Sequence, residues 1–302
     1  MTLSACIRSM RLRTLPLSLS GVVAGIFIAA SQTELKPLTV VFLLLTTVLL
    51  QILTNLSNEL GDTLSGTDRE DRSVARYSLQ DGEITIEEMK RLIASVVVLT
   101  CLSGMLMIWL AMGSLLKREA LFLLVLGALA VLSAMRYTLG RHPYGYRGLG
   151  DFYVFLFFGL VSVCGGYYVC TLDFNLMPAL LPACTIGCFS VGVLNVNNIR
   201  DMKSDAATRV TMAIRLGEKW ARVYQTVLIC GGWALIIVYT LHHYTGPLNF
   251  LYVLTLPAYL MHLKGTWKRR DSDLDPMLPL LVLGTFVFSL LFGTGLLISF
   301  AP

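Results

Sequence analysis

The sequence predicts an all-α integral membrane protein, with nine membrane-spanning helices in a single domain over residues 1–302. Of its 302 residues, 55% are hydrophobic and only 14% are charged, whereas a soluble domain has about 25% charged residues. The mean hydropathy is +0.70. The hydrophobic residues gather in long runs, and one helix needs about 20 of them to cross a bilayer. This composition excludes a water-soluble enzyme and a disordered chain.

Nine apolar runs follow one another along the chain. Because a segment in lipid must satisfy its own backbone polar groups, each run is expected to be a helix. The first run follows three arginines and could pass for a signal peptide, but eight further runs come after it. The eighth is the shortest and contains Pro257. The runs are 14–30, 38–56, 92–115, 120–139, 152–172, 176–194, 223–241, 248–263 and 277–301.

The basic residues indicate how these helices are oriented. Nine crossings place 21 of the 24 Lys and Arg residues on the side of the N-terminus, and leave Lys36, Lys117 and Arg118 on the other. The positive-inside rule then predicts a multi-pass protein of the bacterial cytoplasmic (inner) membrane, with its N-terminus and long loops in the cytoplasm and its C-terminus outside. Cytoplasmic cap loops are expected near 57–91, 137–150, 196–219 and 264–276. Sixteen of the nineteen acidic residues lie on this same side.

The first polar motif begins at Asn55, where the second run ends. Asn55, Asn58 and Asp62 are spaced i, i+3, i+7 and would share one face of a helix. Glu59 lies close by on the same turn. Oxygen ligands without His or Cys suit Mg²⁺ and not zinc. Asn58, Glu59 and Asp62 are therefore candidate metal ligands.

A second polar motif repeats this spacing at the end of the sixth run. Asn198, Asp201 and Asp205 are again spaced i, i+3, i+7. A solvated helix end would explain either motif alone. Two similar motifs on one side of the membrane favour a shared site, because polar groups at the membrane boundary are costly unless they are used. We expect the two helix tips to face each other across a cavity.

Cations accompany both acidic motifs. Carboxylates that hold Mg²⁺, surrounded by Arg and Lys, form a receptor for phosphate oxygens. The chain has no G-x-x-x-x-G-K-[ST] loop, which argues against nucleotide hydrolysis. A diphosphate on a lipid-soluble substrate fits best. The cations are Arg69, Arg72, Arg76, Arg141, Arg200, Lys203, Arg209 and Arg215.

A third region, 136–151, connects the fourth and fifth runs. Its glycines and Pro143 predict a tight connector. A plain polar turn would explain the glycines. The density of Tyr and Arg, which include Tyr137, Tyr146 and Arg147, favours a surface that holds an anion and stacks on an aromatic ring.

These motifs resemble those of the membrane aromatic prenyltransferases of the UbiA superfamily, and among them the branch that uses 1,4-dihydroxy-2-naphthoate in menaquinone synthesis. The stretches that carry the resemblance are 11–16, 58–71, 146–151, 155–159, 165–168, 197–201 and 212–217. They run in the family's order from the N-terminus to about Gly217. Beyond that residue the resemblance consists of apolar spans alone.

The sequence departs from the family pattern at several positions. The first motif is usually N-D-x-x-D-x-x-x-D, and here Glu59 takes its second position while Gly66 stands where the last Asp would be. Asp68, two residues later, is the candidate replacement. The family's Y-x-x-x-K becomes Tyr137-x-x-x-Arg141, which keeps the cation. Arg209 supplies the positive charge of a shortened G-K-R-T-like stretch.

The resemblance implies nine helices around a central cavity, with Mg²⁺ as cofactor. A polyprenyl diphosphate would donate its polyprenyl group to 1,4-dihydroxy-2-naphthoate, with loss of CO₂ and diphosphate, giving demethylmenaquinone. Membrane lipid is the surrounding partner, and no nucleic acid is expected. Together the motifs and the resemblance assign catalysis to Asp62, Asp68, Asp201 and Asp205, metal binding to Asn58, Glu59, Asp62, Asp201 and Asp205, and substrate binding to Arg76, Tyr137, Arg141, Tyr146, Arg147, Asn198, Lys203 and Arg209.

Two alternatives stay open. One is a relative with another aromatic acceptor, such as 4-hydroxybenzoate, haem or chlorophyllide, against which the 146–151 stretch argues. The other is a transporter whose acidic loops gate a pathway. Transporters place ionisable residues near the bilayer midplane, whereas here they gather at one end.

Overall fold

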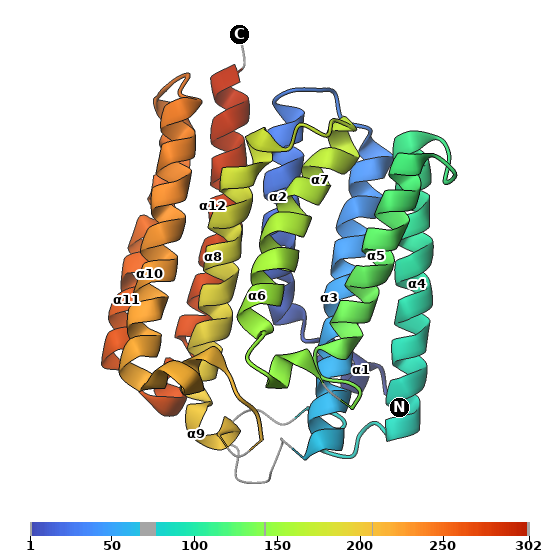
Figure 1. The fold of residues 1–302 in the computed structure, drawn as a ribbon, viewed down its shortest axis with the longest axis vertical. Helices are drawn as coiled ribbons and strands as arrows, with labels where there is room; N and C mark the ends of the chain where they lie inside the picture. The colour runs from blue at the N-terminus through green and yellow to red at the C-terminus, as the bar shows by residue number, and fades with distance from the viewer. Residues whose placement is uncertain (1, 67–76, 142, 207, 301–302) are drawn as a thin grey trace.

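The chain folds into a bundle of long, nearly parallel helices (Figure 1). The structure is a computed structural model, and it describes residues 2–66, 77–141, 143–206 and 208–300. Within these ranges the regular structure is helical, apart from a single bridge pair between Arg147 and Val210. The predicted all-α class is confirmed.

Seven helices within the described ranges are long, of which α10 is kinked at Gly217, and two further segments along the bundle are composite. The long helices are α2 (Leu15–Ala30), α3 (Pro37–Ser65), α4 (Ile86–Met112), α5 (Arg118–Arg136), α8 (Met177–Arg200), α10 (Met212–His242) and α12 (Met277–Phe300). One composite crossing joins α6 (Gly150–Val154), the π-helical η3 (Phe155–Val161) and α7 (Ser162–Thr171), and the other joins η4 (Pro247–Thr255) and α11 (Leu256–Lys268). The short elements are α1 (Leu3–Met10), η1 (Leu12–Thr14), η2 (Tyr144–Tyr146), α9 (Met202–Asp205) and η5 (Asp271–Leu274).

Eight helical segments among the described residues are long and apolar enough to cross a membrane. The expected ninth crossing corresponds to η4 and α11, which fall outside this set. The two pieces have 9 and 13 residues. At rises of about 2.0 Å per residue for a 3₁₀-helix and about 1.5 Å for an α-helix, together they extend about 37 Å. This length exceeds the roughly 30 Å hydrocarbon core.

The helices form two groups joined through α2 and the α6–η3–α7 crossing. Helices α3, α4 and α5 pack together on one side, and α8, α10, α11 and α12 on the other (Figure 1). Helix α2 contacts both α7 and α12 closely. The second group is filled by an aromatic cluster in which Phe189 contacts Tyr259 and Phe288 at ring-centroid distances of 4.6 and 5.4 Å. Trp233 and Tyr252 complete it.

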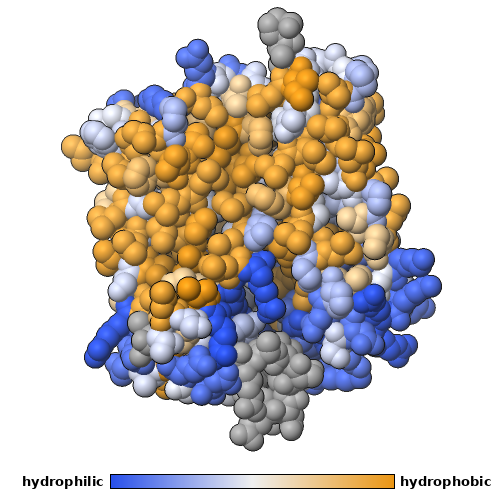
Figure 2. Space-filling view, turned by 180° about the vertical axis from the view of Figure 1, so that it is seen from behind, coloured by the Kyte–Doolittle hydropathy of each residue, from blue (hydrophilic) through white to orange (hydrophobic). Residues whose placement is uncertain are grey.

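Polar side chains gather at one end of the bundle, below a broad apolar band (Figure 2). The C-terminal end of α3, the short helix α9 and helix α1 lie at this end, whereas α12 ends at the opposite one (Figure 1). The positions of α1 and of the end of α12 agree with an odd number of crossings. The polar end therefore holds the ends of both acidic motifs.

Glycine allows the two central crossings to come into backbone contact. A Cβ on Gly25 of α2 would collide with the Val163 carbonyl oxygen of α7, and would lie 2.9 Å from the Tyr167 amide nitrogen. Backbone atoms cannot move aside as a flexible side chain can. Only glycine therefore fits at this crossing.

We expect Gly25→Ala to destabilise the protein by about 1–3 kcal/mol, because the added methyl group forces α2 and α7 apart. Gly165→Ala is the matched control in α7, since a Cβ there meets nothing within 4 Å and alanine favours a helix over glycine by up to about 1 kcal/mol. Thermal unfolding of the two variants in detergent measures the difference. Equal melting temperatures would contradict this account of the crossing.

Candidate active site

The first acidic motif lies on the last two turns of α3. The helix continues through Ser65 and ends at Gly66, whose φ of 67° closes it in the left-handed conformation. Asp62 is 8% exposed, and Asn58 is half-buried. The Thr138 hydroxyl donates to the Asn58 side-chain oxygen at 3.2 Å. This contact docks the tip of α3 against the turn that follows α5.

The spacing of the second acidic motif predicted one straight helix, and the structure shows a break instead. Helix α8 ends at Arg200, Asp201 has φ −92° and ψ 6°, and the single turn α9 follows. Asn and Asp are poor helix formers, and several of them in succession favour a break. The Asp205 amide still donates to the Asp201 carbonyl at 2.9 Å. Both carboxylates are buried, at 5% and 1% exposure.

Tyr146 and Arg209 connect the two motifs. The Tyr146 hydroxyl donates to Asp62 Oδ1 at 2.6 Å. The Arg209 guanidinium lies 5.5 Å from the centre of the Tyr146 ring, and its Nη2 pairs with Asp205 Oδ1 at 3.1 Å. The Val210 amide donates to the Tyr146 carbonyl at 3.0 Å, which fixes the two loops together. We call this series, Asp62–Tyr146–Arg209–Asp205, the acid–base bridge.

The carboxylates of the bridge stabilise the positive charge of Arg209. Burial alone would lower the pKa of the Arg209 guanidinium, but the carboxylates of Asp205 and Asp62 raise that pKa above its ordinary value. Burial also raises the pKa of Tyr137 to about 12. Near neutral pH Tyr137 is therefore a neutral hydroxyl beside the bridge and a hydrogen-bond donor.

Arg200 was counted among the cations in the sequence but was not assigned to the site. Its Nε and Nη2 donate to the two oxygens of Asp201 at 2.8 and 2.7 Å. Nη2 also reaches Asn197 Oδ1 at 2.8 Å, and Nη1 reaches Asp275 Oδ1 at 2.7 Å. Its position directly before Asp201 was the only signal in the sequence, and spacing alone could not reveal the link to Asp275.

Asp151 is a second residue that was not assigned from the sequence. It lies in the first turn of α6, is 8% exposed, and interacts with the Tyr224 side chain of α10. Its Oδ1 is buried without a hydrogen-bond partner among the described residues. A carboxylate at the start of an apolar run was the available signal.

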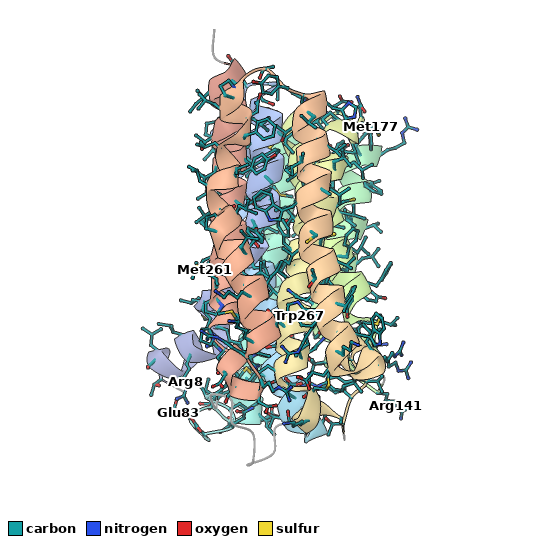
Figure 3. All side chains as sticks on the ribbon, turned by 90° about the vertical axis from the view of Figure 1, so that its left-hand side faces the viewer. Arg8, Glu83, Arg141, Met177, Met261 and Trp267 are labelled. Carbon is teal, nitrogen blue, oxygen red and sulfur yellow. The ribbon has the colours of Figure 1, made fainter. Side chains whose placement is uncertain are left out.

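Glu59 is not placed with the other predicted metal ligands. Its Oε1 accepts from the Ser9 hydroxyl at 3.2 Å and from the Leu79 amide at 2.8 Å, and the side chain is fully buried. Both partners belong to the layer formed by α1 and the segment before α4. In the same layer, Arg8 of α1 forms ion pairs with Asp81 and Glu83 of the segment before α4; Arg8 and Glu83 are labelled at the lower left of Figure 3. These contacts hold Oε1 of Glu59 in this layer, and its assignment as a metal ligand stays a prediction.

The other predicted binding residues divide into buried and exposed positions. Asn198 is 6% exposed on the last turn of α8. Lys203 is 82% exposed and pairs with Asp271 at 2.9 Å, so its ammonium is turned to solvent. Arg141 and Arg147 are also exposed, and Arg141 lies at the edge of the polar end in Figure 3. Asp68 and Arg76 lie outside the described residues.

The donor set fits Mg²⁺ better than a softer metal. Asn58, Asp62, Asp201 and Asp205 offer oxygen atoms only, and the described residues contain no preformed group of three His, Cys, Asp or Glu side chains able to enclose an ion. Mg²⁺ is commonly held by one or two carboxylates together with substrate phosphates, and not by an all-protein cage. The buried carboxylates at this end match that mode.

Comparison with known proteins identifies a family that this chain matches. Residues 18–278 match the UbiA prenyltransferase family. The chain is 37% identical over 298 residues to the 1,4-dihydroxy-2-naphthoate octaprenyltransferase of Escherichia coli (strain K12), an alignment that covers 98% of this chain and 96% of that protein.

Solved structures share the fold. The apo structure of a UbiA homolog from Aeropyrum pernix K1 matches with a TM-score of 0.73 at 16% identity, over 95% of this chain and 98% of that one. A UbiA homolog from Archaeoglobus fulgidus bound to DMAPP and Mg²⁺ matches with a TM-score of 0.68 at 14% identity, over 98% of each chain. The overall arrangement of helices is therefore common to all three proteins.

The bridge makes Arg209 and Asp205 energetically dependent on each other. We expect Arg209→Met to destabilise the protein by about 3 kcal/mol, because it removes the Arg209 guanidinium from the buried carboxylate of Asp205. Adding Asp205→Asn should recover part of this loss, so that the double-mutant cycle gives a coupling of about 1–3 kcal/mol. Unfolding measurements on the two single variants and the double variant provide the cycle, and additive losses would contradict the pairing.

Proposed function

The chain belongs to the UbiA prenyltransferase family, which confirms the resemblance, and we propose that it transfers a polyprenyl group from a polyprenyl diphosphate to 1,4-dihydroxy-2-naphthoate in menaquinone synthesis. One observation carries the choice of acceptor. The 37% identity to the Escherichia coli octaprenyltransferase extends over nearly the full length of both chains. It therefore includes the 146–151 stretch, which supplies Tyr146 to the acid–base bridge, and the 197–201 stretch, which ends four residues before Asp205.

The bridge supports binding of the donor's diphosphate. Arg209 offers guanidinium donors for phosphate oxygens, and charge-assisted bonds of this kind are among the strongest in proteins. Asn58, Asp62, Asp201 and Asp205 would hold Mg²⁺, in agreement with the Archaeoglobus fulgidus homolog, which binds DMAPP and Mg²⁺. When bound, Mg²⁺ would neutralise charge that develops on the departing diphosphate. Tyr146 fixes the Asp62 carboxylate for this task.

In the proposed transfer, the polyprenyl group replaces the carboxylate on the naphthoate ring. The bond between C1 of the polyprenyl chain and its diphosphate oxygen breaks, and the electron pair leaves with the diphosphate. The ring carbon that carries the carboxylate of 1,4-dihydroxy-2-naphthoate forms a bond to C1. The bond from that carbon to the carboxylate then breaks, its electron pair returns to the ring, and CO₂ leaves. The product is demethylmenaquinone in its reduced, quinol form.

The apolar part of the bundle would hold the isoprenoid tail. Transfer of a CH₂ group from water into an apolar site is worth about 0.8 kcal/mol, but a tail that arrives from the bilayer has already left water. Binding energy must then come mainly from the diphosphate. The concentration of hydrophilic residues at one end of the molecule supports this view (Figure 2).

A direct assay tests the reaction. Membranes containing the protein, supplied with a labelled polyprenyl diphosphate and 1,4-dihydroxy-2-naphthoate, should release CO₂ and form prenylated product only when Mg²⁺ is present. Asp62→Asn and Asp205→Asn should each lower the rate by roughly 10²–10³-fold, because each removes a carboxylate charge that assists departure of the diphosphate. Asp271→Asn is the matched control on an exposed Asp at the same end, and its rate should stay within about twofold of the unaltered protein.

Two other outcomes would redirect the proposal. Faster transfer to 4-hydroxybenzoate than to the naphthoate would keep the prenyltransferase chemistry and replace the acceptor. Absence of product with both acceptors, together with Mg²⁺-independent uptake of the prenyl diphosphate into vesicles, would favour the transporter.

We further propose that the polar end faces the cytoplasm of a bacterium. In a variant without the native cysteines, Arg141→Cys should react with a membrane-impermeant maleimide only after the cells are opened, because residue 141 is exposed at the polar end. Asp173→Cys, between α7 and α8 at the other end, should react in intact cells. The reverse pattern would invert the orientation.

A further inference from the structure

The guanidinium of Arg200 joins a proposed metal ligand to the loop before the last helix. It binds both oxygens of Asp201 from one side and reaches Asp275 on the other, with three contacts of 2.7 to 2.8 Å. Asn197, one turn earlier on α8, accepts a fourth bond at 2.8 Å. Arg200 is therefore held in place by residues from two separate parts of the chain.

The burial of this group makes its contacts strong. The side chain of Arg200 is 11% exposed and that of Asp201 is 5% exposed. A planar fork that faces a carboxylate with two parallel bonds fixes both the position and the rotation of the carboxylate. Each carboxylate oxygen has a second acceptor position. Asp201 can thus stay bound to Arg200 while it accepts a further partner.

We propose that Arg200 is a positioning residue, which orients the Asp201 carboxylate for Mg²⁺ and is itself anchored by Asp275. This inference rests on the proposed function, because it takes Asp201 to be a metal ligand. It extends the site to the 271–276 loop, which carries none of the family's motifs. Residues that orient a ligand commonly change metal affinity by 10–100-fold when they are altered.

A neighbouring ion pair separates this role from simple attachment of the loop. Lys203 and Asp271 also join the α9 region to η5, at 2.9 Å. Their side chains are 82% and 55% exposed, and neither contributes to the fork on Asp201. Asp271→Asn therefore weakens the connection between the same two segments without releasing Arg200.

The direction of each effect follows from charge and geometry. Arg200→Lys keeps the positive charge but replaces the planar fork by a single ammonium, so Asp201 loses its fixed rotation. Asp275→Asn leaves Arg200 intact but weakens the contact that anchors its guanidinium, so the fork on Asp201 is held less firmly. Both variants should therefore weaken Mg²⁺ binding.

The test is a thermal-shift titration of the purified full-length protein in detergent, with MgCl₂ added at a fixed concentration of inorganic diphosphate. The half-saturating Mg²⁺ concentration should rise roughly tenfold in Arg200→Lys and about threefold in Asp275→Asn. Asp271→Asn should stay within about twofold of the unaltered protein. Transfer assays at several Mg²⁺ concentrations should show the same order, with rates that recover at high Mg²⁺.

The results discriminate between the possible explanations. Unchanged Mg²⁺ titrations in Arg200→Lys and Asp275→Asn would overturn the inference, and so would an equal shift in Asp271→Asn, which would indicate general loosening of the loop. Asp275 is 53% exposed, so its variant should fold even if Arg200→Lys does not. No naphthoate is present in the titration. A wrong acceptor would therefore leave the expected shifts intact, whereas an absence of any Mg²⁺ response in the unaltered protein would remove the metal site and this inference with it.

Discussion

Compensation of buried negative charge is the constraint on which the polar end of this protein depends. Asp62, Asp201 and Asp205 are each exposed by 8% or less, and an unpaired carboxylate in such a position is very costly. Tyr146 donates to Asp62 from a distant loop, whereas Asp201 and Asp205 pair with cations close by in the chain, Arg200 and Arg209. The loop that carries Tyr146 must therefore converge on the end of α3, and Val210, next to Arg209, binds the same loop. In the proposed function, a diphosphate and a divalent cation would replace some of those internal pairs.

The sequence was sufficient to predict the apolar runs, the uneven distribution of charge and the two acidic motifs, because each depends on local composition. It was not sufficient to predict pairings between distant loops. The i, i+4 position of Glu59 on its helix gave no sign that Ser9 and Leu79 would enclose it. Lys203 lies within the second motif, yet the break at Asp201 turns it towards solvent. Partner choice of this kind depends on tertiary packing, which spacing along one helix does not contain.

The length of each helix matters to the site as much as its polarity does. Helix α3 extends nine residues past the predicted end of its apolar run, to Ser65, and so carries Asp62 beyond the apolar band. Gly61 makes this extension possible at the polar end, because a Cβ there would lie 2.5 Å from the Thr138 side chain. Thr138 in turn bonds to Asn58. A small residue at one position thus allows α3 to approach the loop that also contains Tyr146.

The C-terminal helices have no family motif, but they fix the helix that carries the second one. The side-chain Nδ2 of Asn195 on α8 donates to the Ala221 carbonyl and to Gln225 Oε1 on α10, both at 2.9 Å. Gln225 lies 2.9 Å from His262 on α11, whose other ring nitrogen lies 3.0 Å from the Met277 carbonyl of α12. Since that carbonyl can only accept, His262 must donate from Nδ1, and its Nε2 then accepts from Gln225 as a neutral ring. Four helices are connected in this way just before Asn198 and Asp201. Apolar spans that appear interchangeable in the sequence therefore determine where the second acidic motif is held.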